Sequence, residues 1–320
     1  MTKRPQVTVL GSLNMDISVT VPALPGPGVT VLGSAARFTP GGKGANQAVA
    51  AARLGAGVRM VGCVGDDDFG RRLLAALRAE GIDADRVRVV PKVPTGLAMI
   101  AVDEAGENLI IVAPGANHQV GPADIANAND AGLLVISAEI PVPAIAQALA
   151  QAEGRKILNL APAPDNAAEL VAAAGERLDW LVVNESEAAA VLGRPVSGLA
   201  DAKQAATELT AKGPRYAVVT AGAHGAALAG PDGTHTIEGF TVTAVDTVGA
   251  GDTFVGALAV AVASGVSPLE ATRGAAAAGA AAVTRHGAQA AMPRPDDVLA
   301  ATGVPWVLAS VYTEGQVNGR

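Results

Sequence analysis

The sequence is poor in the residues that mark several large classes of protein. It holds one cysteine, Cys63, among 320 residues, which excludes an internal disulfide framework and suits a reducing compartment such as the cytoplasm. Aromatic residues make up only 2% of the chain, the net charge is −7, and no basic stretch is interleaved with aromatic residues. Nucleic acid is therefore not an expected partner.

Long hydrophobic runs are also missing, although half of the residues are apolar. The most apolar stretches, 253–263 and 275–283, are short and rich in alanine, so we expect buried helices and no membrane span. The N-terminus leads into an alternating strand without the apolar segment of a signal peptide. This composition predicts an acidic, cytoplasmic α/β enzyme that acts on small molecules.

Short segments rich in β-branched residues alternate with helical segments rich in alanine and leucine. The predicted strands are 7–10, 58–65, 132–137, 156–160, 180–184 and 216–220. The predicted helices are 44–54, 68–80, 142–153, 199–212, 251–264 and 268–283. This alternation predicts an α/β fold with a doubly wound, mostly parallel sheet flanked by helices.

Two segments, 17–39 and 95–112, break the alternation. Both contain extended stretches, with turns at 25–28 and 103–106 and no helix between them, so we expect a small antiparallel β lid outside the main layer. The α/β core is then formed by residues 1–16, 40–94 and 113–295. Residues 296–320 form a C-terminal tail for which the sequence predicts no role.

The segment "VDTVGAGDTF", residues 245–254, places a carboxylate at the start of a predicted helix. Backbone N–H groups of Gly249, Ala250, Gly251 and Asp252 would converge there on an anion such as a phosphoryl group. Asp252 could take the proton of an attacking hydroxyl, or it could be an ordinary helix-start residue. The helix N-terminus should keep Asp252 ionised and therefore a weak base, which phosphoryl transfer tolerates.

Two N-terminal motifs carry polar groups suited to a sugar. In "GSLNMD", Asn14 and Asp16 would leave the same face of an extended strand and could bind adjacent hydroxyls, or form an Asx turn. In "GGKGANQ", the backbone around Gly42 could approach a ligand closely, with Asn46 in the first helical turn. Lys43 could contact a transferred phosphate or be a solvated lysine. The spacing fits neither a Walker A loop nor a dinucleotide-binding loop.

Three further positions follow predicted strands, where ligands bind in open α/β sheets. Asn184 and Glu187 have the spacing of a capping box, and their oxygens could also hold hydrated magnesium. Gly222 and Gly225 could let backbone pack against a nucleotide. Glu139 lies just past the strand 132–137 and before Pro141.

The motifs "GGKGANQAVAAARLGA" and "DTVGAGDTFVGAL" together resemble the two signatures of the ribokinase-like (pfkB) family of sugar kinases, and the likeness runs from about residue 6 to 295. Other segments look more like family members that phosphorylate D-ribose than like fructokinases or nucleoside kinases: "LGSLNMD", "CVGDDDFG", "PGAN", "NLAPAP", "NESEA" and "RHGAQ". The resemblance implies phosphorylation of D-ribose at O5 by ATP with Mg²⁺, a bound K⁺, and a homodimer formed through the lid.

Two alternatives stay open at this stage. One is another pfkB kinase, acting on deoxyribose, a ketohexose or a nucleoside. The other is a sugar-binding regulatory pseudokinase, although the intact "GAGD" argues against it because a binding protein has no need of Asp252.

The resemblance also implies roles for single residues. The sugar would be bound by Asn14, Asp16, Gly42, Asn46 and Glu139, with Asp252 as the base and Gly249, Ala250 and Gly251 as the anion hole. The nucleotide and magnesium-bound water would contact Asn184, Glu187, Thr220, Gly222, Gly225, Gly251 and Ala276. The K⁺ site would be formed by groups of Asp246, Val248, Ala282, Arg285, Gly287 and Ala291.

The sequence departs from the family pattern at two of these positions. Ala276 stands where other members carry a larger polar or aromatic residue, which predicts weaker stacking on adenine. Ala291 stands where serine is frequent, which leaves only its main-chain carbonyl as a cation ligand.

Overall fold

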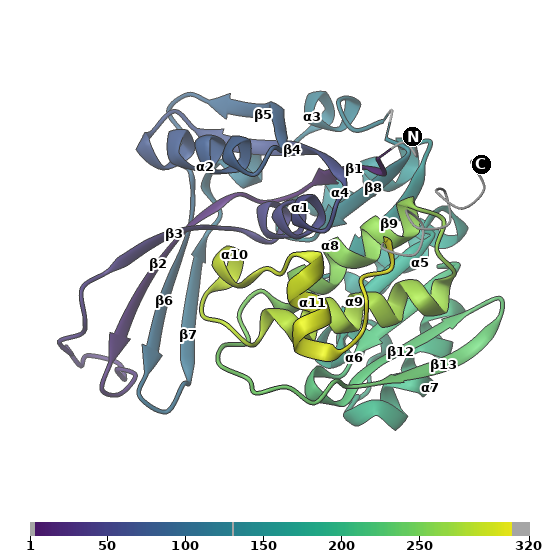
Figure 1. Ribbon diagram of the computed structural model, residues 1–320. Helices are drawn as coiled ribbons and strands as arrows, with labels where there is room; N and C mark the ends of the chain where they lie inside the picture. The colour runs from purple at the N-terminus through teal and green to yellow at the C-terminus, as the bar shows by residue number, and fades with distance from the viewer. Residues whose placement is uncertain (1–3, 130, 309–320) are drawn as a thin grey trace, which may run out of the picture.

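The computed structural model describes residues 4–129 and 131–308 (Figure 1). The main sheet contains β1 (Gln6–Leu10), β4 (Gly57–Gly65), β5 (Asp83–Val90), β8 (Leu133–Ser137), β9 (Arg155–Asn159), β10 (Trp180–Asn184), β11 (Tyr216–Thr220), β12 (Gly225–Gly230) and β13 (Gly233–Glu238). Their order is β13-β12-β11-β10-β9-β8-β1-β4-β5. The pairs β11–β12 and β12–β13 are antiparallel and the others are parallel. The predicted mostly parallel sheet is confirmed.

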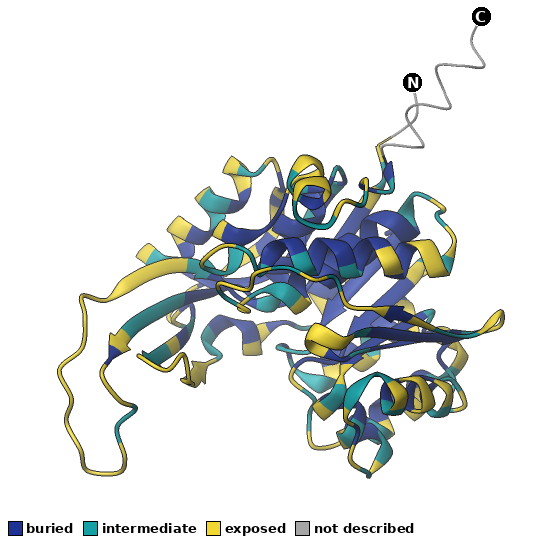
Figure 2. Cartoon of the chain, turned by 60° about the horizontal axis from the view of Figure 1, so that its bottom comes forward, coloured by how far each residue is buried: buried dark blue, intermediate teal, exposed yellow. Residues whose placement is uncertain are grey.

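Helices cover both faces of this sheet, and each face has its own apolar core. One core includes residues of α1 (Lys43–Arg53), α2 (Asp68–Ala79), α8 (Ala250–Ala263), α9 (Pro268–Ala282) and α11 (Pro295–Thr302). The other includes residues of α3 (Pro122–Ala126), α4 (Val142–Gln151), α5 (Ala167–Ala174), α6 (Glu185–Leu192) and α7 (Gly198–Thr210). Figure 2 shows the buried strands between these layers.

The six predicted helices occur in the structure with ends within two residues of those expected. None of the helices in the described residues is long and apolar enough to cross a membrane. Cys63 is fully buried in β4, as predicted for a strand residue.

Three strands of the main sheet were not predicted. In β5, charged residues are frequent because the strand lies at the sheet edge, and only every third residue along it is buried. The β12–β13 hairpin is composed largely of glycine, alanine and threonine, so its sequence lacks the apolar β-branched run that marks the other strands. Its pairing is stabilised by burial against α7 and α9.

The segments predicted to form a lid contribute to a second sheet of β2 (Asn14–Val21), β3 (Arg37–Gly41), β6 (Gly96–Asp103) and β7 (Asn108–Ala113), in the order β3-β2-β6-β7. The two outer pairs are antiparallel, as predicted, but β2 and β6 pair in parallel, so the sheet is mixed. The boundary expected between residues 16 and 17 falls inside β2. In Figure 1 this sheet extends away from the helical layers.

Residues 22–36 form a loop in place of the extended stretches expected on either side of a turn at 25–28, and the turn itself is present, with the Val29 N–H donating to the Gly26 carbonyl at 3.1 Å. The segment contains Pro22, Pro25 and Pro27, which have no N–H group to donate to a neighbouring strand. The turn predicted at 103–106 is present, with the Gly106 N–H donating to the Asp103 carbonyl at 3.0 Å.

Close packing by glycine brings α1 against β1 and α8. A Cβ atom on Gly44 would lie 2.6 Å from the Gly11 carbonyl carbon, and one on Gly256 would lie 2.7 Å from the Gln47 carbonyl oxygen. The absence of side chains at these positions lets the backbones approach, so that α1 and the start of α8 face each other across a short distance.

The part of the C-terminal tail that is described packs on the core. After α11, Trp306 is buried and its indole N–H donates to the Leu54 carbonyl at 2.9 Å, at the end of α1. Residues 309–320 of the predicted tail lie outside the described residues.

Candidate active site

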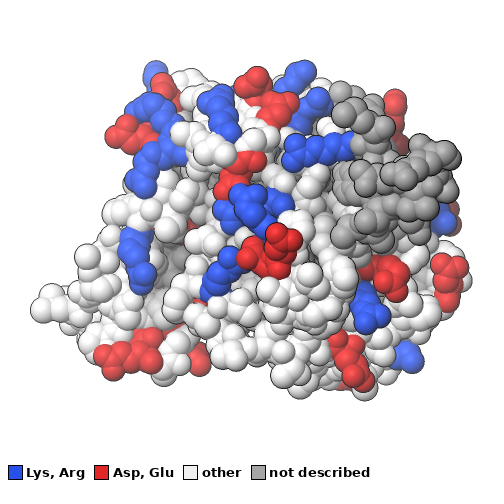
Figure 3. Space-filling view, in the orientation of Figure 1, with Lys and Arg blue, Asp and Glu red and all other residues white. Residues whose placement is uncertain are grey.

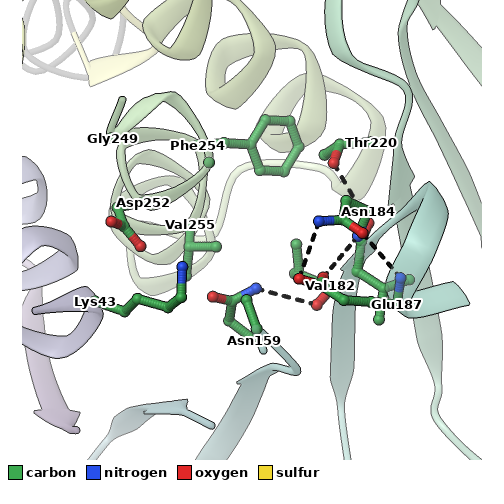
Figure 4. Close-up of a pocket in the computed structure, with 13 residues that line it drawn as sticks. Lys43, Asn159, Val182, Asn184, Glu187, Thr220, Gly249, Asp252, Phe254 and Val255 are labelled. Carbon is green, nitrogen blue, oxygen red and sulfur yellow. Dashed lines mark hydrogen bonds between the residues drawn. The ribbon is translucent and has the colours of Figure 1, made fainter. Parts of the chain in front are cut away.

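Two cavities meet at the start of α8, beside the carboxyl ends of β9, β10 and β11. The first, of about 140 Å³, is shown in Figure 4. Its lining includes Lys43, Asn159, Asn184, Glu187 and Asp252. The second, of about 360 Å³, has a mostly apolar lining, and Thr220, Gly251 and Phe254 border both cavities. The location at the strand ends agrees with the prediction for an open α/β sheet.

Asp252 lies in the first turn of α8 and is 8% exposed. Gly249 precedes the helix with φ of 80°, a left-handed conformation that favours glycine. The N–H groups of Gly251 and Asp252 have no acceptor within the described part of the chain, whereas the Ala250 N–H donates to the Thr247 carbonyl at 3.3 Å. The free N–H groups and the helix N-terminus form a favourable position for an anion.

Both carboxylate oxygens of Asp252 accept hydrogen bonds from α1. The Asn46 amide donates to Oδ2 at 2.9 Å, and the Gln47 amide donates to Oδ1 at 3.2 Å. Burial raises the pKa of Asp252, while Lys43 and the two amides act in the opposite direction. The expectation of a weak base was wrong in direction, because the cost of burying the charge exceeds these favourable interactions.

A cluster of charged groups surrounds Lys43, at the start of α1. Burial lowers the pKa of Lys43, but Asp252, Glu139, Glu187 and Asp16 act against burial and leave it above its usual value. Lys43 is half-buried and lies along the first cavity in Figure 4, which favours contact with a ligand over the alternative of a freely solvated lysine.

Asp16 and Glu139 reach this cluster from different segments. Burial, Glu139 and Asp252 raise the pKa of Asp16 to about 7, against the effect of Lys43. A side chain on Gly41 of β3 would overlap the Asp16 carboxylate, so this glycine makes room for it. Glu139 Oε2 accepts from the Ser12 hydroxyl at 2.5 Å and from the Lys43 N–H at 3.2 Å.

Asn14 and Asp16 are two residues apart on β2, as the sequence predicted. The Asn14 Oδ1 accepts from the Asn117 amide at 2.7 Å, and the Asn117 Oδ1 accepts from the Leu13 N–H at 2.9 Å. Because the Asn14 oxygen already accepts from Asn117, the Asn14 NH₂ group is the part of the side chain that can donate to a ligand.

Asn184 and Glu187 form the predicted capping box at the start of α6. The Glu187 N–H donates to Asn184 Oδ1 at 2.9 Å, and the Asn184 N–H donates to Glu187 Oε2 at 2.8 Å. The structural interpretation of the pair is therefore confirmed. Both residues also line the first cavity, and burial raises the pKa of Glu187 to about 6.

The second cavity brings together the remaining positions predicted for a nucleotide. Thr220, Gly222, Gly225 and Ala276 line it, with Phe254 at its border to the first cavity. Gly225 has φ of 108°, and a side chain there would meet the Ile237 carbonyl. The apolar lining and exposed backbone suit a flat heterocycle better than a sugar.

The predicted cation residues lie behind the start of α8. Asp246 Oδ1 accepts from the Val248 N–H at 3.0 Å, and Oδ2 accepts from the Gly287 N–H at 2.8 Å, so this carboxylate caps the turn that precedes α8. The Arg285 side chain pairs with Asp297 at 3.2 Å. Ala282 ends α9 and Ala291 ends α10 (Ala288–Ala291). Within residues 4–129 and 131–308, no group of three or more His, Cys, Asp or Glu side chains could hold a metal ion.

Sequence reasoning missed several polar residues of the site. Ser12, Gln47, Asn117, Asn159 and Gln289 each donate to or accept from a predicted site residue or one of its partners. Each lies in or beside a motif that was singled out, and a buried amide or hydroxyl among small apolar residues was the available signal.

Residues 4–295 match the pfkB family carbohydrate kinases. The chain belongs to this family. This pfkB kinase is 37% identical to the ribokinase of Haemophilus influenzae, over 92% of its own chain and 98% of the relative. The ribokinase structure from Thermotoga maritima superposes with a TM-score of 0.82 at 34% identity, covering 92% of this chain and 98% of the other. The Arabidopsis thaliana ribokinase complexed with ribose and ATP has a TM-score of 0.81 at 32% identity, covering 93% and 98%.

Proposed function

We propose that this pfkB kinase transfers the γ-phosphoryl group of ATP to the O5 hydroxyl of D-ribose. The observation that carries the proposal is the position of Asp252, a buried carboxylate that lines the first cavity beside free N–H groups at a helix start, where Gly251 also borders the apolar cavity. The similarity to ribokinases, including one bound to ribose and ATP, supports ribose as the sugar.

The sugar would bind between β2 and α1. Asn14, Asp16, Asn46 and Glu139 supply donors and acceptors for its hydroxyls, and the backbone at Gly42 approaches from α1. A side chain on Gly42 would meet the Asn14 N–H nitrogen at 2.6 Å, so only glycine fits there. Closely set polar groups of this kind distinguish a polyol from an apolar ligand.

In the proposed reaction, Asp252 accepts the O5 proton as O5 forms a bond to the γ-phosphorus. The bond from that phosphorus to the bridging oxygen breaks, and ADP carries the electron pair away. The free N–H groups of Gly251 and Asp252 stabilise the charge on the transferred phosphoryl oxygens, whereas the Ala250 N–H predicted for the anion hole is bonded to Thr247; Lys43 faces the same charge from α1. The raised pKa of Asp252 makes it a better proton acceptor than a solvated aspartate.

ATP would lie with its base in the apolar cavity beside Ala276 and with its phosphates toward Gly251. Mg²⁺ held by the phosphates and water would neutralise their charge, with Asn184 and Glu187 contacting its water. The absence of a three-ligand acidic cluster in the described residues fits an ion held mainly by substrate and water.

A single assay series tests the sugar. We expect ADP release to be fastest with D-ribose among a panel of pentoses, hexoses, deoxyribose and nucleosides at equal concentration. A higher kcat/KM with any other acceptor would replace ribose as the substrate, and no ADP release with any acceptor would favour a regulatory pseudokinase.

K⁺ would bind on the far side of the α8 loop. The Asp246 carboxylate links the segment 245–248 to 283–287, and the two backbones also meet where the Val245 N–H donates to the Val283 carbonyl at 2.7 Å. A carboxylate with carbonyls of Val248, Ala282, Arg285, Gly287 and Ala291 matches the oxygen ligands of a large monovalent cation.

We expect K⁺ to raise kcat with a smaller effect on ribose KM, because ordering the loop aligns its N–H groups before charge develops. Asp246→Ala should lose most of this activation. The measurement is kcat in potassium, sodium and tetramethylammonium chlorides at matched ionic strength, together with the melting temperature in each salt. Equal rates and equal melting temperatures in all three would eliminate the site.

The lid would close over the sugar and pair with the lid of a second copy. Apolar side chains on it are exposed, including Met99 at 42% and Ile111 at 54%, and Figure 3 shows this part of the surface largely uncharged apart from an acidic group at its lower edge and a basic side chain above it. A second copy would cover this surface.

We expect ribose to slow hydrogen exchange in 17–39 and 95–112, because closure excludes water. Ile111→Glu should shift the sedimentation coefficient from that of a dimer to that of a monomer. Unchanged exchange would contradict closure, and a monomeric unaltered protein would contradict the dimer.

A further inference from the structure

Gln47 is a buried amide in contact with the proposed base, and no role has yet been assigned to it. Its side chain lies on α1 and is 0% exposed. The Nε2 group donates both to Asp252 Oδ1 at 3.2 Å and to Asn159 Oδ1 at 2.9 Å. Asn159 also lines the first cavity, where Figure 4 shows its side chain near the end of Lys43.

The orientation of Gln47 is determined by Asn159. The Asn159 Nδ2 group donates to the Val182 carbonyl at 3.3 Å, the bond drawn in Figure 4, and a carbonyl can only accept. Asn159 therefore presents its oxygen to Gln47, and Gln47 must donate. The second hydrogen of the same NH₂ group is then directed at Asp252.

The oxygen of the Gln47 amide gains nothing from this orientation, which indicates that neighbouring residues impose it. Its Oε1 is buried and has no hydrogen-bond partner in the described part of the chain. A buried acceptor without a partner is unfavourable, so the orientation is retained at a cost to stability. Such a cost is typical of residues held for function.

The second carboxylate oxygen of Asp252 also accepts from an amide whose orientation is fixed by another residue. Gln289 Nε2 donates to Asn46 Oδ1 at 3.1 Å, which leaves the Asn46 amide to donate to Asp252 Oδ2. Consecutive residues of α1 thus direct one N–H group at each carboxylate oxygen, and residues from two other segments fix both amides.

We infer that Gln47 is a positioning residue that fixes the plane of the Asp252 carboxylate and favours its ionised, proton-accepting form, with Asn159 restricting Gln47 to the role of donor. The inference rests on the proposed role of Asp252 as the base. Gln47 would then contribute to the reaction without contacting the sugar or ATP.

The ionisation of Asp252 also depends on its charged neighbours. Burial and Glu139 raise its pKa, whereas Lys43 and the amides lower it, and Asp252 in turn raises the pKa of Asp16 and of Glu187. All of these groups are retained when Gln47 alone is changed. Removal of its N–H donor should therefore move the pKa of Asp252 upward.

The test is Gln47→Met, which keeps length and removes the donor. We expect kcat to fall about 10-fold with sugar and ATP KM within about twofold, since the contact orients a proton acceptor and does not bind substrate. The acidic limb of the kcat–pH profile should move up by about one unit, the size of one lost hydrogen bond to a charged group. Gln147→Met, on the surface of α4, makes the same change without contact to the site and should leave all three unchanged.

Gln47→Glu is the second variant, because it has the same shape as glutamine. Its carboxylate would repel that of Asp252, so the acidic limb should move up further. If Gln47→Met does not fold, Gln47→Glu decides the question alone, with circular dichroism and melting temperature as the measures of folding.

The outcomes separate this inference from the proposed function. If Asp252→Asn loses activity but the folded Gln47 variants keep the kcat and acidic limb of the unaltered enzyme, the inference is overturned. If Asp252→Asn keeps its activity, the proposed base is wrong. If both hold, Gln47→Met should cause no further loss of kcat in the Asp252→Asn background.

Discussion

Asp252→Asn is expected to lower kcat by at least about 10²-fold while the fold and sugar binding persist. An asparagine cannot accept the O5 proton. Its NH₂ group would also face one of the two donors on α1, Asn46 or Gln47, where the carboxylate now accepts from both. Steady-state kinetics with ribose and ATP, and calorimetric titration with ribose, measure the two quantities separately.

The control for this prediction is Asp232→Asn, an exposed aspartate between β12 and β13. It should have the kcat of the unaltered enzyme. Turnover of the Asp252 variant within about threefold of this control would rule out general-base catalysis by that carboxylate.

Asp16→Ala is expected to raise the ribose KM by about 10- to 100-fold with a much smaller change in kcat. Hydrogen bonds from sugar hydroxyls to a carboxylate exist in both the ground state and the transition state, so their loss weakens binding uniformly. The ATP KM should stay near its original value. A ribose KM equal to that of the unaltered enzyme would move the sugar site elsewhere.

The raised pKa of Asp16 adds a pH dependence to this prediction. With a pKa of about 7, the group is mostly protonated below pH 7, and the protonated form offers a weaker acceptor to the sugar. Ribose KM should therefore rise as the pH falls below 7. Asp16→Asn should have a high KM that no longer depends on pH in this range; a persistent dependence would assign the titration to another group.

The sequence was sufficient to predict those strands and helices that are marked by a pattern among neighbouring residues. Buried parallel strands appear as β-branched runs, and helices end at residues such as Gly55 and Gly81, both with positive φ. The edge strand β5 and the hairpin β12–β13 lack these patterns, because their position depends on pairing and not on their own composition.

The site was predicted only in part, because contacts between distant segments leave no local pattern in the sequence. Asn46 and Asp252 were found through their motifs, but their direct contact joins positions 206 residues apart. Gln47 and Asn159, 112 residues apart, were missed because no spacing along the chain indicates that they meet. The direction of the pKa shift of Asp252 was predicted wrongly because burial cannot be measured from the sequence.

The cytoplasmic location and the exclusion of nucleic acid stay predictions, which cell fractionation and binding assays would check.

Strand β2 has a consequence for protein engineering. It runs without interruption from Asn14 to Val21 and pairs with β6 along its whole length, so the two residues of the proposed sugar site belong to the same strand as the small sheet. A chimaera that received the lid of another kinase would need a junction inside this strand, between the sugar ligands and their support. Because Asn14 and Asp16 pair with Gly96 and Ala98 of β6, exchange of the small sheet would also replace the backbone that holds the proposed sugar ligands.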